Sequence, residues 1–217
     1  MREQFAIELQ LLEQQFLTLG HCVLEAASKA MLALSAKDQD MAEHIIAGDK
    51  MINQFQVDIE LACARILALQ QPQVTDLRLV ITIMSACSDL ERMGDHMAGV
   101  SKSILHLQAA DAITEIEEGL HEVGQKALKM LDQLLDSFPK HAAKDALAIA
   151  KQDEAIDALY YSLSKEVINL MKVQEASIRN GTEYLKILGH LERFGDYIAT
   201  ICERMVYLET GELIELN

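Results

Sequence analysis

Two short stretches of the chain each place a glutamate and an aspartate four residues apart. "LERMGD" contains Glu91 and Asp95, and "LERFGD" contains Glu192 and Asp196. Residues four apart lie on the same face of a helix, so each pair brings two carboxylates close together. Two partly buried carboxylates repel each other, so either one is protonated or a cation lies between them. This spacing therefore indicates metal binding.

A second pair of acidic motifs precedes these stretches. "AGDKMIN" contains Asp49 and Asn53, and in the second half of the chain "KQDEAID" contains Asp153 and Asp157. Each motif flanks a stripe of apolar residues with the spacing of an amphipathic helix. If the helices that carry the two kinds of motif pack antiparallel, each half of the chain gains one oxygen-rich cluster. Carboxylates on facing helices bind hard or borderline divalent metals.

A simpler interpretation exists for any single pair of this kind. Two partly exposed acids can be paired with a neighbouring arginine, here Arg92 or Arg193. Two copies in the same local context, each with a matching aspartate motif, favour metal binding instead. Gly94 and Gly195 stand directly before the late aspartates, although a glycine inside a helix costs roughly 1 kcal/mol relative to alanine. They indicate a close backbone approach or room for an ion, with loose packing as the alternative.

Helical periodicity places the first carboxylate pair on the apolar side of its helix. At about 100° per residue, Glu91 and Asp95 fall within the apolar arc, so we expect them to lie away from the solvated face. The opposite arc contains Asp89 and His96. We predict that His96 and its counterpart Tyr197 are surface residues rather than metal ligands.

The elements that must position these residues are helices. The most frequent residues are the helix formers Leu, Ala, Met, Glu, Gln and Lys, and the chain has only 2 prolines. No run of alternating β-branched residues indicates a strand. Breaks near residues 35–38, 70–75, 109–114, 138–140 and 175–182 leave six helical segments. Because the order of the motifs repeats, we predict an all-α protein of two tandem three-helix bundles. The first repeat is expected to span residues 1–108 and the second 109–217.

The charge balance excludes several classes of partner. The chain carries 34 acidic and 19 basic side chains, a net charge of -15, without a cluster of lysines and arginines. Nucleic acids and anionic lipid surfaces both require such a cluster, so we exclude them as partners. The N-terminal stretch carries acids, unlike a secretory signal, and no run approaches the ~20 apolar residues of a membrane span. The 4 cysteines lie far apart, as is typical of thiols in a reducing compartment, so we expect a cytoplasmic protein without membrane insertion.

With these motifs the chain resembles the PhoU family of phosphate-signalling regulators. The resemblance covers the whole length, with "LER-x-GD" late in each repeat and D-x-x-x-D/N in the preceding helix. It implies a negative regulator of phosphate uptake and phosphate-starvation signalling. The implied partners are the ATPase subunit of the phosphate-specific ABC transporter and a sensor histidine kinase. Whether the chain also forms homo-oligomers is left open by the resemblance.

The resemblance also implies a metal site in each repeat. Family members bind iron or zinc clusters through these acids, and others are described with magnesium or manganese. The metal-binding residues that the resemblance implies are Asp49, Asn53, Glu91, Asp95, Asp153, Asp157, Glu192 and Asp196. Asn53 stands where the second repeat has an acid, so the first cluster carries one charge fewer. Gly99 and Thr200 replace the asparagine that the family often has four residues after the late aspartate.

Two other functions compete with that of a regulator. One is a di-metal carboxylate enzyme or metal store, and the other is a helical scaffold without metal. Ferritin-like di-iron enzymes need E-x-x-H from two helices, whereas this chain has only Glu118 with His121. The S-x-x-K motif of Ser162 and Lys165 lacks its S-D-N and K-T-G companions. We therefore expect no catalytic residues and no enzymatic activity.

Overall fold

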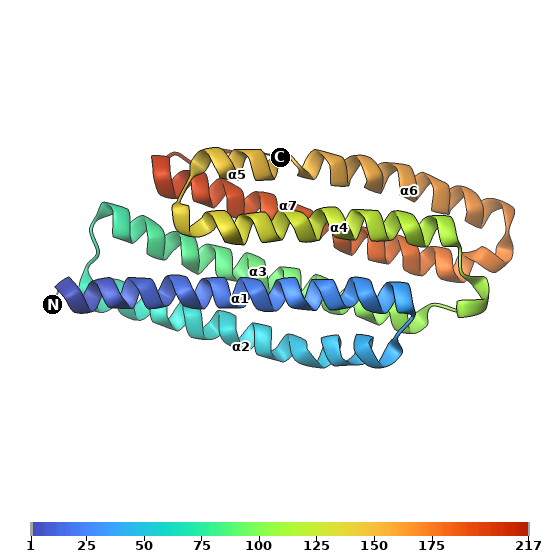
Figure 1. The fold of residues 1–217 in the computed structure, drawn as a ribbon, viewed down its shortest axis with the longest axis horizontal. Helices are drawn as coiled ribbons and strands as arrows, with labels where there is room; N and C mark the ends of the chain where they lie inside the picture. Colours follow the sequence, from blue (N-terminus) through green and yellow to red (C-terminus); the bar gives the residue numbers. More distant parts are fainter. Residues whose placement is uncertain (1, 217) are drawn as a thin grey trace.

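The computed structural model describes residues 2–216, and every regular element in this range is helical (Figure 1). The α-helices are α1 (Arg2–Ala36), α2 (Gln39–Gln70), α3 (Val74–His106), α4 (Thr114–Ser137), α5 (Ala143–Ala150), α6 (Asp153–Val173) and α7 (Ile178–Thr210). Short 3₁₀ turns at Ala109–Asp111, Phe138–Lys140 and Glu175–Ser177 fall near the expected breaks. The all-α prediction is confirmed for this range. Met1 and Asn217, the outer ends of the two predicted repeats, lie outside it.

The fifth predicted segment is divided, which the sequence did not indicate. α5 ends at Ala150 and α6 begins at Asp153, with a turn at Lys151 and Gln152 between them. In the first repeat the corresponding helix, α2, is continuous. As a result Asp153 lies in the first turn of α6, where the positive end of the helix dipole favours a carboxylate.

The two halves of the chain lie side by side along their length. In Figure 1, α1, α2 and α3 form the lower half, and α4 to α7 form the upper half. α3 packs against α7 and α1 against α4, so both halves contribute to one continuous core. The offset that relates Asp49 to Asp153 also relates buried Phe16 of α1 to buried Leu120 of α4. The repeat seen in the motifs is therefore also a repeat of core positions.

α1 is more apolar than expected from the sequence. An 18-residue window within Gln4–Ala36 reaches a mean hydropathy of 1.2, enough by length and composition for a membrane span, and 44% of that window is buried. The helices of a protein core share this composition. Leu12, Phe16 and Leu19 are fully buried, so the packing of the bundle accounts for the inward face of α1.

Polar side chains predicted to be solvated instead form the interface between the repeats. His96 Nδ1 of α3 lies 2.9 Å from His190 Nδ1 of α7, and Arg92 donates to the Tyr197 hydroxyl at 3.4 Å. His96 and Tyr197 are half-buried and their rings lie 5.6 Å apart between centroids. The prediction that both are surface residues was wrong. Helical periodicity separates polar from apolar faces, but it does not distinguish solvent from a polar interface.

An ion pair crosses the same interface. Arg204 Nε of α7 donates to Asp89 Oδ2 of α3 at 2.8 Å, and only 10% of the Asp89 side chain is exposed. Burial raises the pKa of Asp89, and Arg204 acts against that rise. The arginine therefore stabilises the charged form of this buried carboxylate.

A buried side-chain amide, that of Asn180, binds the segment that connects the repeats. Asn180 of α7 accepts from the Gln108 amide at 2.9 Å and donates to the carbonyls of Gln108 and Asp111, also at 2.9 Å. These bonds fix the chain where it leaves α3. They thus set how α4 begins relative to α7.

The histidine pair predicts a pH effect on stability. Burial, followed by the charge of His190, lowers the pKa of His96 to about 4. The unfolded chain takes up a proton near pH 6.5 that the folded protein does not, so stability is lost as the pH falls between these values. From roughly pH 7.5 to 5.5, metal-free wild type should lose about 1 kcal/mol more than His96→Gln, after allowance for partial solvent screening. Urea unfolding at both pH values measures this, and equal losses would contradict it.

Candidate metal centre

The second repeat brings three carboxylates to one place. Asp153 and Asp157 lie one turn apart on α6 and face Asp196 on α7, and one oxygen from each lies within 4.8 Å of the others. Asp153 is buried, and the other two are half-buried. Three of the four residues predicted for this cluster are therefore neighbours.

Glu192 lies beside this group but outside it. Arg193 approaches Glu192 Oε2 at 3.8 Å and donates to Asp196 Oδ2 at 3.1 Å. The arginine side chain is 63% exposed, so water screens its charge and the pairs are weak. Burial still raises the pKa of Glu192 and of Asp196, with the neighbouring acids adding to the rise. The arginine does not neutralise the cluster.

The first repeat places its acids in a looser arrangement. Burial and then the charge of Asp95 raise the pKa of Asp49, and burial followed by Asp95 and Asp49 raises that of Glu91. Glu91 is half-buried, but Asp95 is exposed, so the expectation that it lies off the solvated face was wrong. Periodicity gives the direction of a side chain, not how far the next helix covers it. Asp49 Oδ1 and Asn53 Oδ1 are buried and make no hydrogen bond.

The two motif glycines let neighbouring helices approach the aspartates closely. A Cβ at Gly195 would overlap Asp153 Oδ1. At Gly94 it would lie 3.0 Å from Ile52 and 3.4 Å from Asp49 Oδ1. The interpretation of close backbone approach is confirmed: Gly195 makes room for Asp153 of α6, and Gly94 makes room mainly for Ile52 of α2.

Gly195→Ala should therefore destabilise the protein by about 1 to 3 kcal/mol, because the new methyl group has no room beside Asp153. Gly189 is the matched control, since it lies in the same helix and a Cβ added to it would have nothing within 4 Å. Gly189→Ala should stabilise by about 0.5 to 1 kcal/mol through helix propensity. Chemical unfolding measures both. Equal effects of the two substitutions would show that Gly195 is merely a tolerated glycine.

The donors in both clusters fit a hard or borderline cation. They are carboxylate and amide oxygens, and raised carboxyl pKa values mark groups whose charge a cation would stabilise. In the first repeat the buried, unbonded oxygens of Asp49 and Asn53 would gain a partner. No histidine or cysteine belongs to either set, so the donors fit magnesium, manganese or iron more closely than thiolate-type zinc.

The acid and histidine of the single E-x-x-H motif lie elsewhere. Glu118 and His121 line a separate groove on α4, where His121 Nδ1 lies 3.3 Å from Ser35 Oγ. They do not meet the carboxylate clusters. Sequence reasoning missed the polar interface residues instead, and the pairing of Asp89 with Arg204 had no local signal because the two lie on different repeats.

The family model of the PhoU domain matches the chain twice, over residues 16–104 and 120–205. The chain belongs to the PhoU family. Each matched segment contains one "LER-x-GD" motif and one of the preceding aspartate motifs. The resemblance drawn from these residues is confirmed.

Several PhoU proteins are similar along the whole chain. A phosphate-specific transport system accessory protein PhoU homolog of Streptococcus pneumoniae is 64% identical over 217 residues, covering 100% of both chains. The accessory protein PhoU of Escherichia coli is 31% identical over 209 residues, which cover 96% of this chain and 86% of that one.

Solved PhoU structures share the fold. The phosphate transport system regulatory protein PhoU from Streptococcus pneumoniae superposes with a TM-score of 0.93 at 62% identity, covering 98% of this chain and 100% of that one. PhoU from Pseudomonas aeruginosa gives a TM-score of 0.92 at 31% identity, with 96% and 100% covered. The prediction of a PhoU-like fold built from two three-helix repeats is confirmed.

Proposed function

We propose that this PhoU-family chain is a negative regulator of phosphate uptake and phosphate-starvation signalling. It acts on the ATPase subunit of the phosphate-specific ABC transporter and on a sensor histidine kinase. The observation that carries the proposal is the 64% identity, over the full length of both chains, to a protein named as a phosphate-specific transport system accessory protein.

Metal binding is the second part of the proposal. Asp153, Asp157 and Asp196, with Glu192 beside them, would hold a cation in the second repeat, and the first repeat would use Asp49, Asn53, Glu91 and Asp95. Iron or zinc is expected from the family resemblance, and magnesium or manganese are the alternatives. A bound cation would neutralise repelling carboxylates on facing helices. Occupancy would thereby stabilise the packing of α6 on α7 and of α2 on α3.

The proposal includes no catalytic step. The features that support this are an E-x-x-H motif remote from both carboxylate clusters and a family whose named members are accessory or regulatory proteins. We also place the action of the protein in the cytoplasm. Its cysteines, Cys22, Cys63, Cys87 and Cys202, are free thiols, as is typical of a reducing compartment.

Deletion of the gene tests the regulatory role. Cells without the protein should take up more phosphate, or express starvation genes, in medium rich in phosphate, because a restraint on the transporter and kinase is lost. A plasmid copy should restore both, and uptake of radiolabelled phosphate with a starvation-gene reporter measures them. Unchanged uptake and expression at both high and low phosphate would contradict the proposal.

A further inference from the structure

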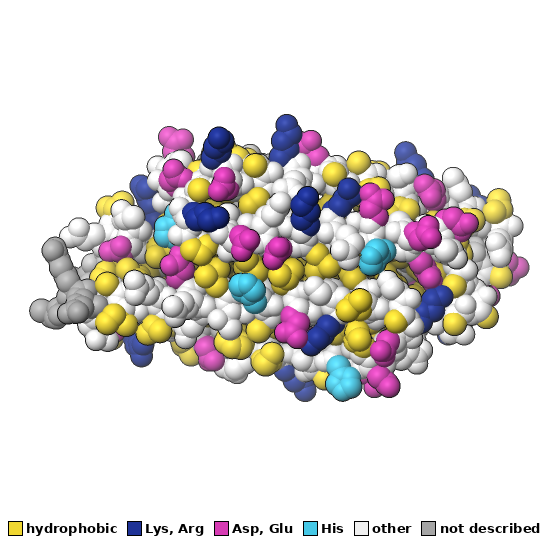
Figure 2. Space-filling model, viewed as in Figure 1, with side chains coloured by type: hydrophobic (Ala, Val, Ile, Leu, Met, Phe, Trp, Pro, Cys, Tyr) yellow, Lys and Arg dark blue, Asp and Glu magenta, His cyan; other side chains and the backbone are white. Residues whose placement is uncertain are grey.

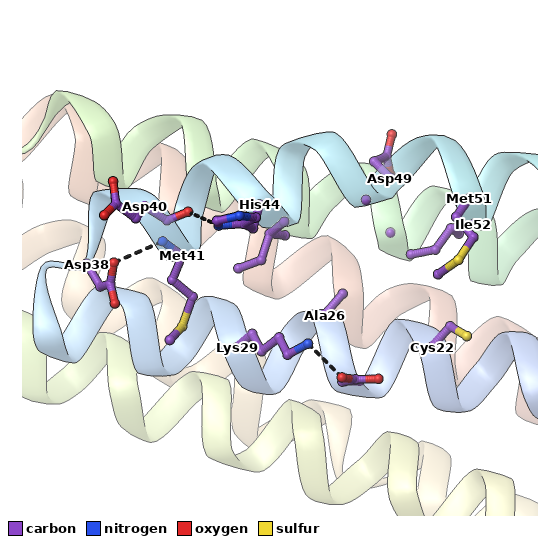
Figure 3. Close-up of a pocket in the computed structure, with 14 residues that line it drawn as sticks. Cys22, Ala26, Lys29, Asp38, Asp40, Met41, His44, Asp49, Met51 and Ile52 are labelled. Atoms are coloured by element: carbon purple, nitrogen blue, oxygen red, sulfur yellow. Dashed lines mark hydrogen bonds and ion pairs between the residues drawn. The ribbon is translucent and has the colours of Figure 1, made fainter.

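A groove of about 570 Å³ lies between α1 and α2 of the first repeat (Figure 3). One face of each helix lines it, with Cys22, Glu25, Ala26 and Lys29 spaced along α1 as neighbours on a helix surface. Its apolar lining consists of Cys22, Ala26, Met41, Ile45, Met51 and Ile52. Met51 is 56% exposed, so this apolar surface reaches solvent.

Small residues keep the groove open. A Cβ at Gly48 would have nothing within 4 Å, and Ala26 faces it from α1. In the second repeat the position equivalent to Gly48 is Gln152, and the position equivalent to Ala26 is Met130, by the same sequence offset that relates Asp49 to Asp153. Met130 is fully buried. The corresponding space is therefore filled in the second repeat.

A hydrogen bond bridges the helices at the equivalent place in the second repeat. Gln152 Nε2 donates to Gln133 Oε1 at 2.6 Å. The counterpart of Gln133 in the first repeat is Lys29, which pairs with Glu25 on its own helix at 2.6 Å and reaches no residue of α2 in Figure 3. The open groove is thus a specific difference between two otherwise matching repeats.

Acids surround the apolar lining. Glu25 stands on α1, while Asp38 and Asp40 lie at the start of α2, and the whole chain carries a net charge of -15 (Figure 2 shows one face of the molecule coloured by side-chain type). Asp38 caps α2 by accepting from the Met41 amide at 2.9 Å. Lys29 also lines the groove, but Glu25 offsets its charge. The groove therefore suits a ligand with an apolar face and positive flanks.

We propose that this groove binds an amphipathic helix of a partner protein, with its apolar face between α1 and α2 and basic residues against Asp38 and Asp40. The α2 lining from Met41 to Met51 extends about 15 Å at the rise of an α-helix, which matches roughly three turns of a bound helix. Packing of a helix into a groove between two others is the arrangement already found throughout this bundle. This inference goes beyond the proposed function, which requires no particular docking surface.

The groove and the first carboxylate cluster adjoin each other along α2, because Asp49 and Gly94 also line the groove. Asp49 is at the edge of the groove, and in Figure 3 its carboxylate points away from α1. The binding of the helix does not require a metal. Variants that change the groove can therefore leave Asp49 and the other acids of the cluster intact.

A synthetic peptide of leucine and lysine, spaced to form a basic amphipathic helix of about three turns, serves as the probe. Cys22 lines the groove and is half-buried, whereas Cys63, Cys87 and Cys202 are fully buried. Saturating peptide should slow alkylation of Cys22 in the wild-type protein by about tenfold or more. This corresponds to a tenfold fall in the fraction of protein whose groove is free of peptide. A peptide of the same composition in scrambled order should not protect Cys22.

A filled-groove variant copies the second repeat. Ala26→Met, Lys29→Gln and Gly48→Gln together should weaken peptide binding by about tenfold or more, measured by fluorescence anisotropy. The matched control makes the same kinds of change on the exposed face of α6, with Ala155→Gln, Ala158→Met and Lys165→Gln. The control should bind as wild type does. Circular dichroism verifies that both variants are folded.

Three results would overturn the proposal. Equal protection of Cys22 by the ordered and scrambled peptides would show diffuse electrostatic attraction, and this result needs no variant. Equal affinity of wild type and a folded filled-groove variant would place the peptide elsewhere. A wild-type dimer in sedimentation that becomes monomeric in the filled-groove variant would make a second copy of this chain the occupant.

Discussion

Replacing both Asp153 and Asp196 by asparagine is expected to lower the affinity of the second repeat for a divalent cation by about 100-fold or more. Loss of residues that only orient metal ligands costs roughly 10 to 100-fold, and these two would be ligands themselves. Each substitution removes a charge but keeps the size of the side chain. Isothermal titration of metal-free protein with iron, zinc, manganese and magnesium measures the change.

The first repeat supplies the matched comparison. Asp49→Asn with Asp95→Asn should remove a weaker site, because Asn53 provides one charge fewer than Asp157. The second-repeat variant should remain folded, and its metal-free form is expected to be no less stable than wild type, since repulsion between neighbouring carboxylates is relieved. A loss of affinity accompanied by unfolding would attribute the effect to structure rather than to ligation.

Arg204→Ala is expected to destabilise the protein by about 2 to 3 kcal/mol. It leaves Asp89 buried and charged without its partner, and breaking a fully buried pair costs roughly 3 to 5 kcal/mol, which is reduced here because the arginine side chain is 33% exposed. Urea unfolding measures the difference. Because the pair joins α3 to α7, the variant should also loosen the contact between the repeats.

The control for this prediction is a surface ion pair. Lys126 lies 3.4 Å from Glu122 on α4, and their side chains are 41% and 58% exposed, so Lys126→Ala should change stability by less than about 0.5 kcal/mol. If Arg204→Ala is no more destabilising than Lys126→Ala, the Asp89 pair is not a structural link between the repeats.

The helices and their repeat could be predicted because both follow from patterns of residues that are close together in the sequence. Amphipathic spacing and the positions of Pro72 and Pro139 mark where helices run and end, and the doubled motifs indicate two copies of one unit. The division of α5 from α6 could not be predicted, because Lys151 and Gln152 contain neither glycine nor proline. The repeat boundary between residues 108 and 109 stays a prediction.

The environment of polar residues depends on packing between distant segments, which local patterns do not contain. Asp89 and His96 share the polar arc of α3 with solvated residues, yet both lie against α7. Asp95 was expected off the solvated face and is exposed, while Asp153 is buried. The open groove also has a sequence signal, the difference between Gly48 and its counterpart Gln152, but its meaning is clear only once the structure is known.

The metal content of the purified protein tests most directly whether the paired carboxylates hold a cation. Wild type and the Asp153→Asn, Asp196→Asn variant are purified in parallel from cells grown at high and low phosphate, and elemental analysis by mass spectrometry gives the metal per chain. We expect bound iron, zinc, manganese or magnesium in wild type and a clear loss in the folded variant. Equal metal content in the two proteins would contradict metal binding. The paired carboxylates would then be acids that are solvated by water and paired with arginine.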